Sequence, residues 1–143
     1  RDCLLSRGLG DVYKRQGDLL KLRFAMKEKV MQADSRVRQD EGKVAIMRGP
    51  VVYCLEEADN GQGLPLVRVK PDAVFTEEKT DELGFTMIML RVDAKTKKPV
   101  TVENGLYQTW QKPVYEGKEL RFIPYYAWAN RGEGEMEVWV NQL

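Results

Sequence analysis

Alternation of apolar and polar residues is the dominant pattern along the chain after residue 16. The even-numbered positions from Leu20 to Met26 are large and apolar, whereas the positions between them are Lys, Arg and Ala. Because successive side chains of a strand point to opposite faces, this alternation predicts a half-buried β-strand.

The next apolar runs are Lys43–Met47 and Val51–Leu55, separated by a segment that contains Pro50. Proline cannot donate a hydrogen bond to a sheet, so Pro50 is expected at a bend, a strand start or an edge. Val51–Leu55 is apolar or aromatic on both faces, which predicts a strand covered on both sides. Cys54 is expected there as a small buried hydrophobe.

Shorter β-like runs occupy most of the remaining chain. The Asp59-Asn60-Gly61 sequence predicts an exposed loop from Glu56 to Pro65, and Lys95–Pro99 is expected to form a basic turn. A closing strand alternates Met136 and Val138 against Glu137 and Trp139. The other runs are Val30–Val37, Leu66–Val69, Ala73–Thr76, Thr86–Val92, Val100–Val102 and Leu120–Ile123.

These runs predict the fold class. No stretch sustains apolar residues at helical spacing for three turns, and no internal repeat of about 20 to 50 residues is present. Alternating runs spaced roughly 8 to 12 residues apart favour an all-β fold, an antiparallel, jelly-roll-like β-sandwich of about eight to ten strands. We expect residues 17–143 to form this single domain.

The first 16 residues read differently from the rest. RDCLLSRGLGDVYKRQ has no sustained period, and it resembles translated adapter sequence more than a native linker. We therefore expect a non-native or disordered leader at residues 1–16. Because the chain starts at Arg1, we also expect it to be a piece of a longer protein.

Composition narrows the classes of function. The 23 Lys and Arg nearly balance 22 Asp and Glu, so no basic field favours nucleic acid as a partner. The apolar runs are far shorter than the roughly 20 residues of a membrane-spanning helix, so no membrane partner is expected. The chain has no histidine and only Cys3 and Cys54, which argues against a zinc site and against Ser-His or Cys-His catalysis. We expect no cofactor in this chain.

Carboxylate pairs are candidate catalytic groups because glycosidases use two carboxyl groups about 5 to 9 Å apart. The available groups are the pairs Glu56-Glu57 and Glu77-Glu78 and the row Glu133, Glu135 and Glu137. Adjacent strand residues point to opposite faces, and the row alternates with apolar residues as a solvent-facing row does. Surface carboxylates are therefore expected, and Asp59-Asn60-Gly61 is read as a plain turn without the pattern of a calcium loop.

An aromatic segment near the C-terminus offers the richest candidate site. An exposed ring can cover the C–H face of a sugar while amide and guanidinium groups bind hydroxyls, but the same rings also serve packing. Strand alternation would place Tyr126 and Trp128 on one face, and Gly132 would supply a turn with positive φ. The candidate interface or sugar-contact residues are Tyr125, Tyr126, Trp128, Asn130 and Arg131, with a looser second cluster at Tyr107, Trp110 and Tyr115.

Two sequence blocks carry a family resemblance. They are Gly42–Glu56 (GKVAIMRGPVVYCLE), followed by Asp59-Asn60, and Ile123–Gly132 (IPYYAWANRG), followed by Glu135–Trp139 (EMEVW). In this order they closely resemble the C-terminal part of glycoside hydrolase family 127, the β-L-arabinofuranosidases. The resemblance covers about Gly17 to the C-terminus and is loose between Leu64 and Gly117.

The resemblance implies a limited role for this chain. Family members look like a catalytic (α/α)6 barrel followed by β-sandwich domains, and the cysteine nucleophile, its zinc and the active-site Glu and His residues belong to the barrel. None of them maps onto this chain, and Cys54 is not matched to the nucleophile.

Three hypotheses follow. The first is a non-catalytic accessory sandwich of a bacterial glycoside hydrolase, with the missing catalytic barrel as its partner. The second is a carbohydrate-binding module that acts through Tyr126–Arg131, with an arabinose-containing glycan as its ligand. The third is a small independent enzyme.

Overall fold

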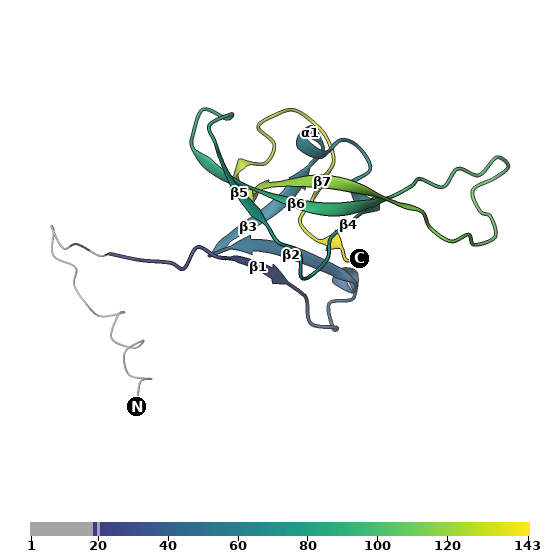
Figure 1. The fold of residues 1–143 in the computed structure, drawn as a ribbon, viewed down its shortest axis with the longest axis horizontal. Helices are drawn as coiled ribbons and strands as arrows, with labels where there is room; N and C mark the ends of the chain where they lie inside the picture. Colours follow the sequence, from purple (N-terminus) through teal and green to yellow (C-terminus); the bar gives the residue numbers. More distant parts are fainter. Residues whose placement is uncertain (1–18, 20) are drawn as a thin grey trace.

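The structure is a computed structural model that describes residue 19 and residues 21–143. The predicted leader, residues 1–16, lies outside the described residues. The strands are β1 (Glu28–Met31), β2 (Lys43–Arg48), β3 (Val51–Glu56), β4 (Val67–Arg68), β5 (Thr76–Thr80), β6 (Met87–Lys97), β7 (Tyr115–Pro124), β8 (Met136–Glu137) and β9 (Val140–Asn141). The helical turns are η2 (Arg38–Asp40), α1 (Glu57–Asn60), η3 (Leu64–Leu66) and η4 (Tyr125–Ala127). Figure 1 shows a curled β-sheet, with the segment between β6 and β7 projecting as a long arm at one end.

Among the described residues, nine strands form one sheet, and all of the strand pairings are antiparallel. Six of them follow the order β1-β2-β3-β7-β6-β4, while β5 pairs with β6 and β8 with β3. β9 pairs with β2, and the chain just after it bridges back to Val69 beside β4. The pairings thus run in a closed circuit, which curls the sheet around a core. The prediction of an all-β antiparallel fold is confirmed.

The core inside the curled sheet is built from alternate residues of its strands. Leu55, Leu90 and Phe122 face inward from β3, β6 and β7, and each is fully buried. Phe122 lies opposite both Leu55 and Leu90 in the strand register, so it joins three strands at one level. Each fully buried side chain of this size contributes about 1.5–3 kcal/mol to folding.

A second, smaller core covers the outer face of the same strands. Cys54, Met89 and Ile123 point outward and pack with Ala127 of η4. The prediction that Val51–Leu55 is covered on both sides, with Cys54 buried, is therefore confirmed. This outer core fixes the position of η4, which carries the aromatic candidate residues.

Several local predictions were wrong. The described residues from 21 to 27 form no strand, and Leu22 and Phe24 are exposed, because no described strand pairs with them. The first strand is Glu28–Met31 instead, held in register by Val30 opposite Ile46. An alternating pattern shows which side chains need burial, but it does not show whether a neighbouring strand is present to pair with the segment.

The other differences lie in turns and strand ends. The run Ala73–Thr76 was predicted as β-like, but the strand β5 begins only at Thr76 and extends to Thr80. Val100–Val102 forms no strand. The expected basic turn at Lys95–Pro99 is the end of β6, which continues to Lys97 in pairs with β7. The closing strand is split into β8 on β3 and β9 on β2.

Candidate functional site

The aromatic segment forms a 3-10 turn instead of the expected strand. Pro124 ends β7, since it has no N–H for a further ladder, and Trp128 N donates to Tyr125 O at 3.2 Å. Residues three apart eclipse one another in a 3-10 helix. Tyr125 and Trp128 therefore share a face and stack, with ring centroids 5.9 Å apart.

This turn corrects the predicted arrangement of faces. Tyr126 does not share a face with Trp128; its ring lies near Phe85, 6.3 Å between centroids. Ala127 points inward and is fully buried in the outer core.

Two ring pairs, Tyr125 with Trp128 and Tyr126 with Phe85, are together called the aromatic cluster. Tyr125, Tyr126 and Trp128 are 45%, 62% and 40% exposed. Self-sufficient monomers seldom leave several large rings together in water.

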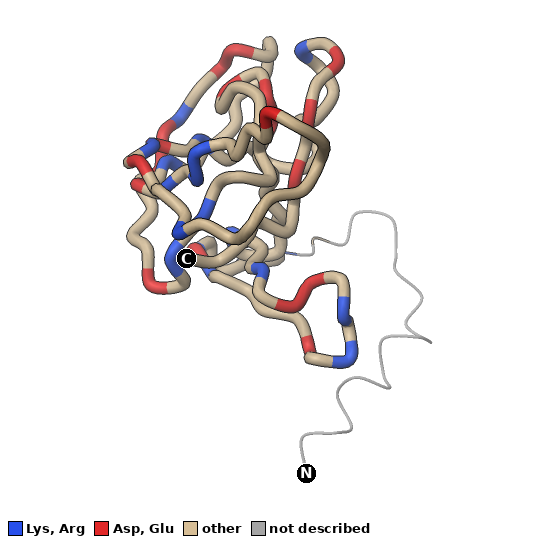
Figure 2. The backbone as a smooth tube through the Cα atoms, turned by 90° about the vertical axis from the view of Figure 1, so that its right-hand side faces the viewer, with Lys and Arg blue, Asp and Glu red and all other residues tan. Residues whose placement is uncertain are grey.

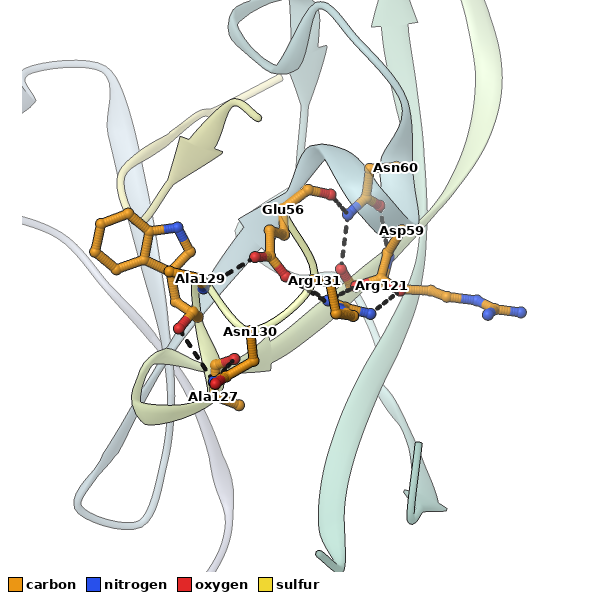
Figure 3. Close-up of polar contacts among 9 residues, drawn as sticks. Glu56, Asp59, Asn60, Arg121, Ala127, Ala129, Asn130 and Arg131 are labelled. Carbon is orange, nitrogen blue, oxygen red and sulfur yellow. Dashed lines mark hydrogen bonds and ion pairs between the residues drawn. The ribbon is translucent and has the colours of Figure 1, made fainter. Parts of the chain in front are cut away.

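A buried ion-pair network anchors the segment that follows the cluster (Figure 3). Arg131 donates from Nη1 to Asp59 Oδ1 at 2.7 Å and from Nε to Glu56 Oε2 at 3.2 Å, and its Nη2 contacts both carboxylates. The side chains of Glu56 and Asp59 are 5% and 6% exposed, and that of Arg131 is 17% exposed. The hydrogen bonds that Arg131 donates to Asp59 and to Glu56 raise the pKa of its guanidinium, although burial opposes this shift.

Asn60 ties this network to β7. Its Nδ2 donates to Glu56 O and Arg121 O, and its Oδ1 accepts from Arg121 N, at 2.9–3.0 Å (Figure 3). Buried amides are stable only when such bonds are made. The network therefore joins α1, β7 and the segment after η4.

The backbone after Trp128 is held by the same network. Ala129 has a φ of +65°, a region that favours glycine, and its N–H donates to Glu56 Oε1 at 3.1 Å. Asn130 Nδ2 donates to Ala127 O and Trp128 O at 2.9 and 3.3 Å, and Gly132 has the expected positive φ. The Asn130 amide nitrogen and the Arg131 guanidinium, the donors that could bind a sugar, are thus engaged within the chain.

These contacts overturn two sequence-based expectations. Glu56 is buried, not a surface carboxylate, and Asp59-Asn60-Gly61 belongs to α1 and its end instead of a plain turn. The signal present in the sequence was the position of Glu56 at the end of a run apolar on both faces. Its partner Arg131 lies 75 residues further along the chain, which local patterns do not connect.

The predicted solvent-facing row of glutamates is confirmed at Glu133 and Glu135, which are exposed, and is wrong at Glu137. Glu135 Oε2 accepts from the N–H groups of Gly63 and Leu64, both at 2.8 Å, so it shapes the turn before η3. Glu137 is partly buried, one of its carboxylate oxygens has no hydrogen-bond partner among the described residues, and burial raises its pKa. Glu135, directly before β8, therefore links this part of the chain to the turn before η3.

A known protein family matches this chain over most of its length. Residues 28–141 match the model of the glycoside hydrolase family 127 C-terminal domain. The chain belongs to this family. The predicted resemblance is confirmed over most of the described chain.

Known relatives agree with this assignment. The chain is 38% identical over 131 residues to a non-reducing end β-L-arabinofuranosidase of Bifidobacterium longum subsp. longum, matching 85% of this chain and 20% of that protein. A family 127 β-L-arabinofuranosidase structure from Geobacillus stearothermophilus T6 superimposes with a TM-score of 0.74 at 39% identity, over 81% of this chain and 18% of that one. A second family 127 β-arabinofuranosidase structure gives a TM-score of 0.68 at 34% identity, over 81% and 17%. The chain thus spans about a fifth of the length of these relatives.

The family 127 resemblance implies a zinc-bound cysteine, and the residues of this domain do not fit one. The sequence has no histidine, and among residues 19 and 21–143 no three Cys, Asp or Glu side chains lie together as a metal site. Cys54 is fully buried, and burial raises the pKa of its thiol to about 12. A zinc-bound thiolate requires the opposite environment, a thiol with a lowered pKa.

Surface charge and hydropathy single out no further candidate site in the described part of the chain. Basic and acidic residues are interspersed along the chain in the view of Figure 2. Within the described part of the chain, no helix has the length and apolar character needed to cross a bilayer.

The buried Cys54 thiol leads to a prediction about reactivity. Its pKa rises from an ordinary value near 9 to about 12, so its thiolate fraction at pH 8 falls about 1,000-fold, and its sulfur is out of contact with solvent. In a Cys3→Ser variant we expect no labelling of Cys54 by a thiol-specific reagent until the domain unfolds. Kinetics of labelling in zero and denaturing urea test this, and rapid labelling of the folded variant would contradict it.

Proposed function

We propose that this chain is a non-catalytic accessory domain of a β-L-arabinofuranosidase-like glycoside hydrolase, where it packs on and stabilises the catalytic (α/α)6 barrel. One observation carries the proposal: the rings of Tyr125, Tyr126 and Trp128 are exposed although the segment directly after them is held by a buried ion-pair network. Exposed rings of this kind, beside a held backbone segment, are typical of a surface that is covered in the complete protein.

The hydrogen bonding of Asn130 and Arg131, next to the aromatic cluster, supports packing over sugar binding at the cluster. A sugar platform needs free donors and acceptors beside its rings, since hydroxyl groups left without partners weaken binding. Arg131 and Asn130 already bond within the chain. The alternative, a carbohydrate-binding module acting through Tyr126–Arg131, would rely on the rings alone.

The chemistry of the described residues supports a non-catalytic role. Retaining and inverting glycosidases need one carboxylic acid and one free carboxylate across a substrate site. Glu56 is paired with Arg131, and Glu135 accepts two backbone hydrogen bonds. Cys54 is shielded from any substrate.

Hydrolysis assays test this proposal. The purified chain is expected to release no product from an aryl β-L-arabinofuranoside above the rate in buffer, whereas the complete enzyme does. Removing the domain from the complete enzyme is expected to lower the melting temperature by several degrees, because an apolar interface is then exposed. Turnover by the chain that is lost in Glu56→Gln would contradict the non-catalytic role, and an unchanged melting temperature would contradict the packing role.

A further inference from the structure

The sequence contains two Asn-Gly pairs, and the structure places them in opposite environments. Asn60-Gly61 lies at the end of α1, and Asn104-Gly105 lies in the arm between β6 and β7. Asparagine is thermolabile, above all before glycine, because glycine has no side chain to crowd the approach of its backbone nitrogen to the asparagine amide. The fold around each pair decides whether that approach is possible.

The arm holds its residues apart from the packed part of the domain. Residues 98–114 project away from the sheet and form no helix or strand (Figure 1). The arm is closed at its base by Lys98 N donating to Val114 O at 2.9 Å, and among the described residues no backbone hydrogen bond involves residues 99–113. The large rings of Tyr107 and Trp110 are 91% and 79% exposed. The arm is therefore not held in place by packing on this domain.

Asn104 and Gly105 lie in the exposed part of this arm. Within the described chain, the Asn104 side chain makes no hydrogen bond and the Gly105 N–H has no acceptor. The Gly105 nitrogen can thus reach the Asn104 side chain without breaking a hydrogen bond of the domain. Water also has access to both residues.

Asn60 is held in the opposite way. It is 6% exposed, its Nδ2 donates to Glu56 O and Arg121 O, and its Oδ1 accepts from Arg121 N. The next nitrogen is engaged as well, because Gly61 N donates to Glu57 O at 2.7 Å. The same reaction at Asn60 therefore requires local opening of α1 and its contact with β7.

We propose that Asn104 is a site of spontaneous deamidation through a succinimide. The Gly105 nitrogen gives its proton to hydroxide and bonds to Asn104 Cγ, and the Cγ–Nδ2 bond breaks to release ammonia. Water then opens the five-membered ring. Attack of water at Cγ leaves aspartate, and attack at the backbone carbonyl carbon leaves isoaspartate. Nothing is oxidised or reduced, and water is the co-reactant.

The modification changes the arm in two respects. Either product adds a negative charge directly after Glu103, and isoaspartate also lengthens the backbone by one methylene group. The proposal depends on the environment of Asn104 in this chain and not on the accessory role proposed above, so either can fail alone.

Timed incubation of the purified chain in mildly alkaline buffer tests the site. Peptide mapping by mass spectrometry follows the small mass gain that separates an acid from its amide, at Asn104 and Asn60 in the same sample. We expect Asn104 to convert at least about thirtyfold faster than Asn60, the factor expected when opening must first break several hydrogen bonds. The rate at Asn104 should rise with pH, because hydroxide removes the Gly105 proton.

Incubation in denaturing guanidinium chloride is the matched control, since it removes the structural difference and leaves two identical dipeptides. Both sites should then convert at similar rates. Asn104→Gln is expected to abolish the reaction in the arm without changing the melting temperature, because glutamine closes the larger ring far more slowly. Equal rates at the two sites in the folded chain would overturn the proposal. So would an Asn104 that converts in guanidinium chloride but stays intact in the folded chain.

Discussion

Replacing Arg131 with methionine is expected to lower the free energy of unfolding by about 3 kcal/mol, near the low end for a broken buried ion pair. The substitution leaves Glu56 and Asp59 charged, 5% and 6% exposed, and without their partner. The 17% exposure of Arg131 gives water some access, which keeps the loss from being larger. For a domain of this size we expect the melting temperature to fall by about 10 °C.

Arg36→Met is the matched control, because Arg36 also pairs with an aspartate but is 90% exposed. It should leave the unfolding transition in place. Combining Arg131→Met with Glu56→Gln and Asp59→Asn should recover part of the loss, since no charge is then left buried alone. Urea unfolding of the four proteins decides the matter: an Arg131→Met transition that coincides with the wild type would contradict the role given to the network.

Trp128→Ala is expected to act mainly in the complete enzyme. In the chain alone Trp128 is 40% exposed and stacks on Tyr125, so its removal should cost about 1 kcal/mol. In the complete enzyme, where we propose that the barrel covers the ring, we expect about 2–4 kcal/mol, the cost of aromatic truncation in a packed site.

The difference between the two contexts measures the contribution of the interface. Trp110→Ala in the complete enzyme is the control, because that ring lies on the arm at the other end of β7. It should leave the melting temperature unchanged. Equal losses for Trp128→Ala in the chain and in the complete enzyme would contradict burial of the cluster at an interface.

The sequence predicted those parts of the fold in which local pattern and tertiary burial agree. β2 and β3 were found because their apolar runs flank a turn with Gly49 and Pro50, and the burial of β3 on both faces followed from its composition. Cys54 was placed correctly for the same reason.

The candidate site was predicted in its residues but not in its geometry. Alternation cannot show that Pro124 stops the strand, so the rings were assigned to the wrong faces. The ion pairs of Arg131 with Glu56 and Asp59 depend on chain segments more than 70 residues apart, which only the folded sheet brings together. Local pattern alone therefore predicts surface positions for Glu56 and Asp59, because it does not reveal Arg131 as their partner.

The most direct test of the packing account compares the complete enzyme with its Trp128→Ala variant and measures two quantities on each protein, the melting temperature and the affinity for an arabinose-containing oligosaccharide. The account predicts a lower melting temperature in the variant, with nearly unchanged affinity and KM for a small arabinoside. An unchanged melting temperature with weakened oligosaccharide binding would contradict it and would favour a sugar-binding site at Tyr126–Arg131.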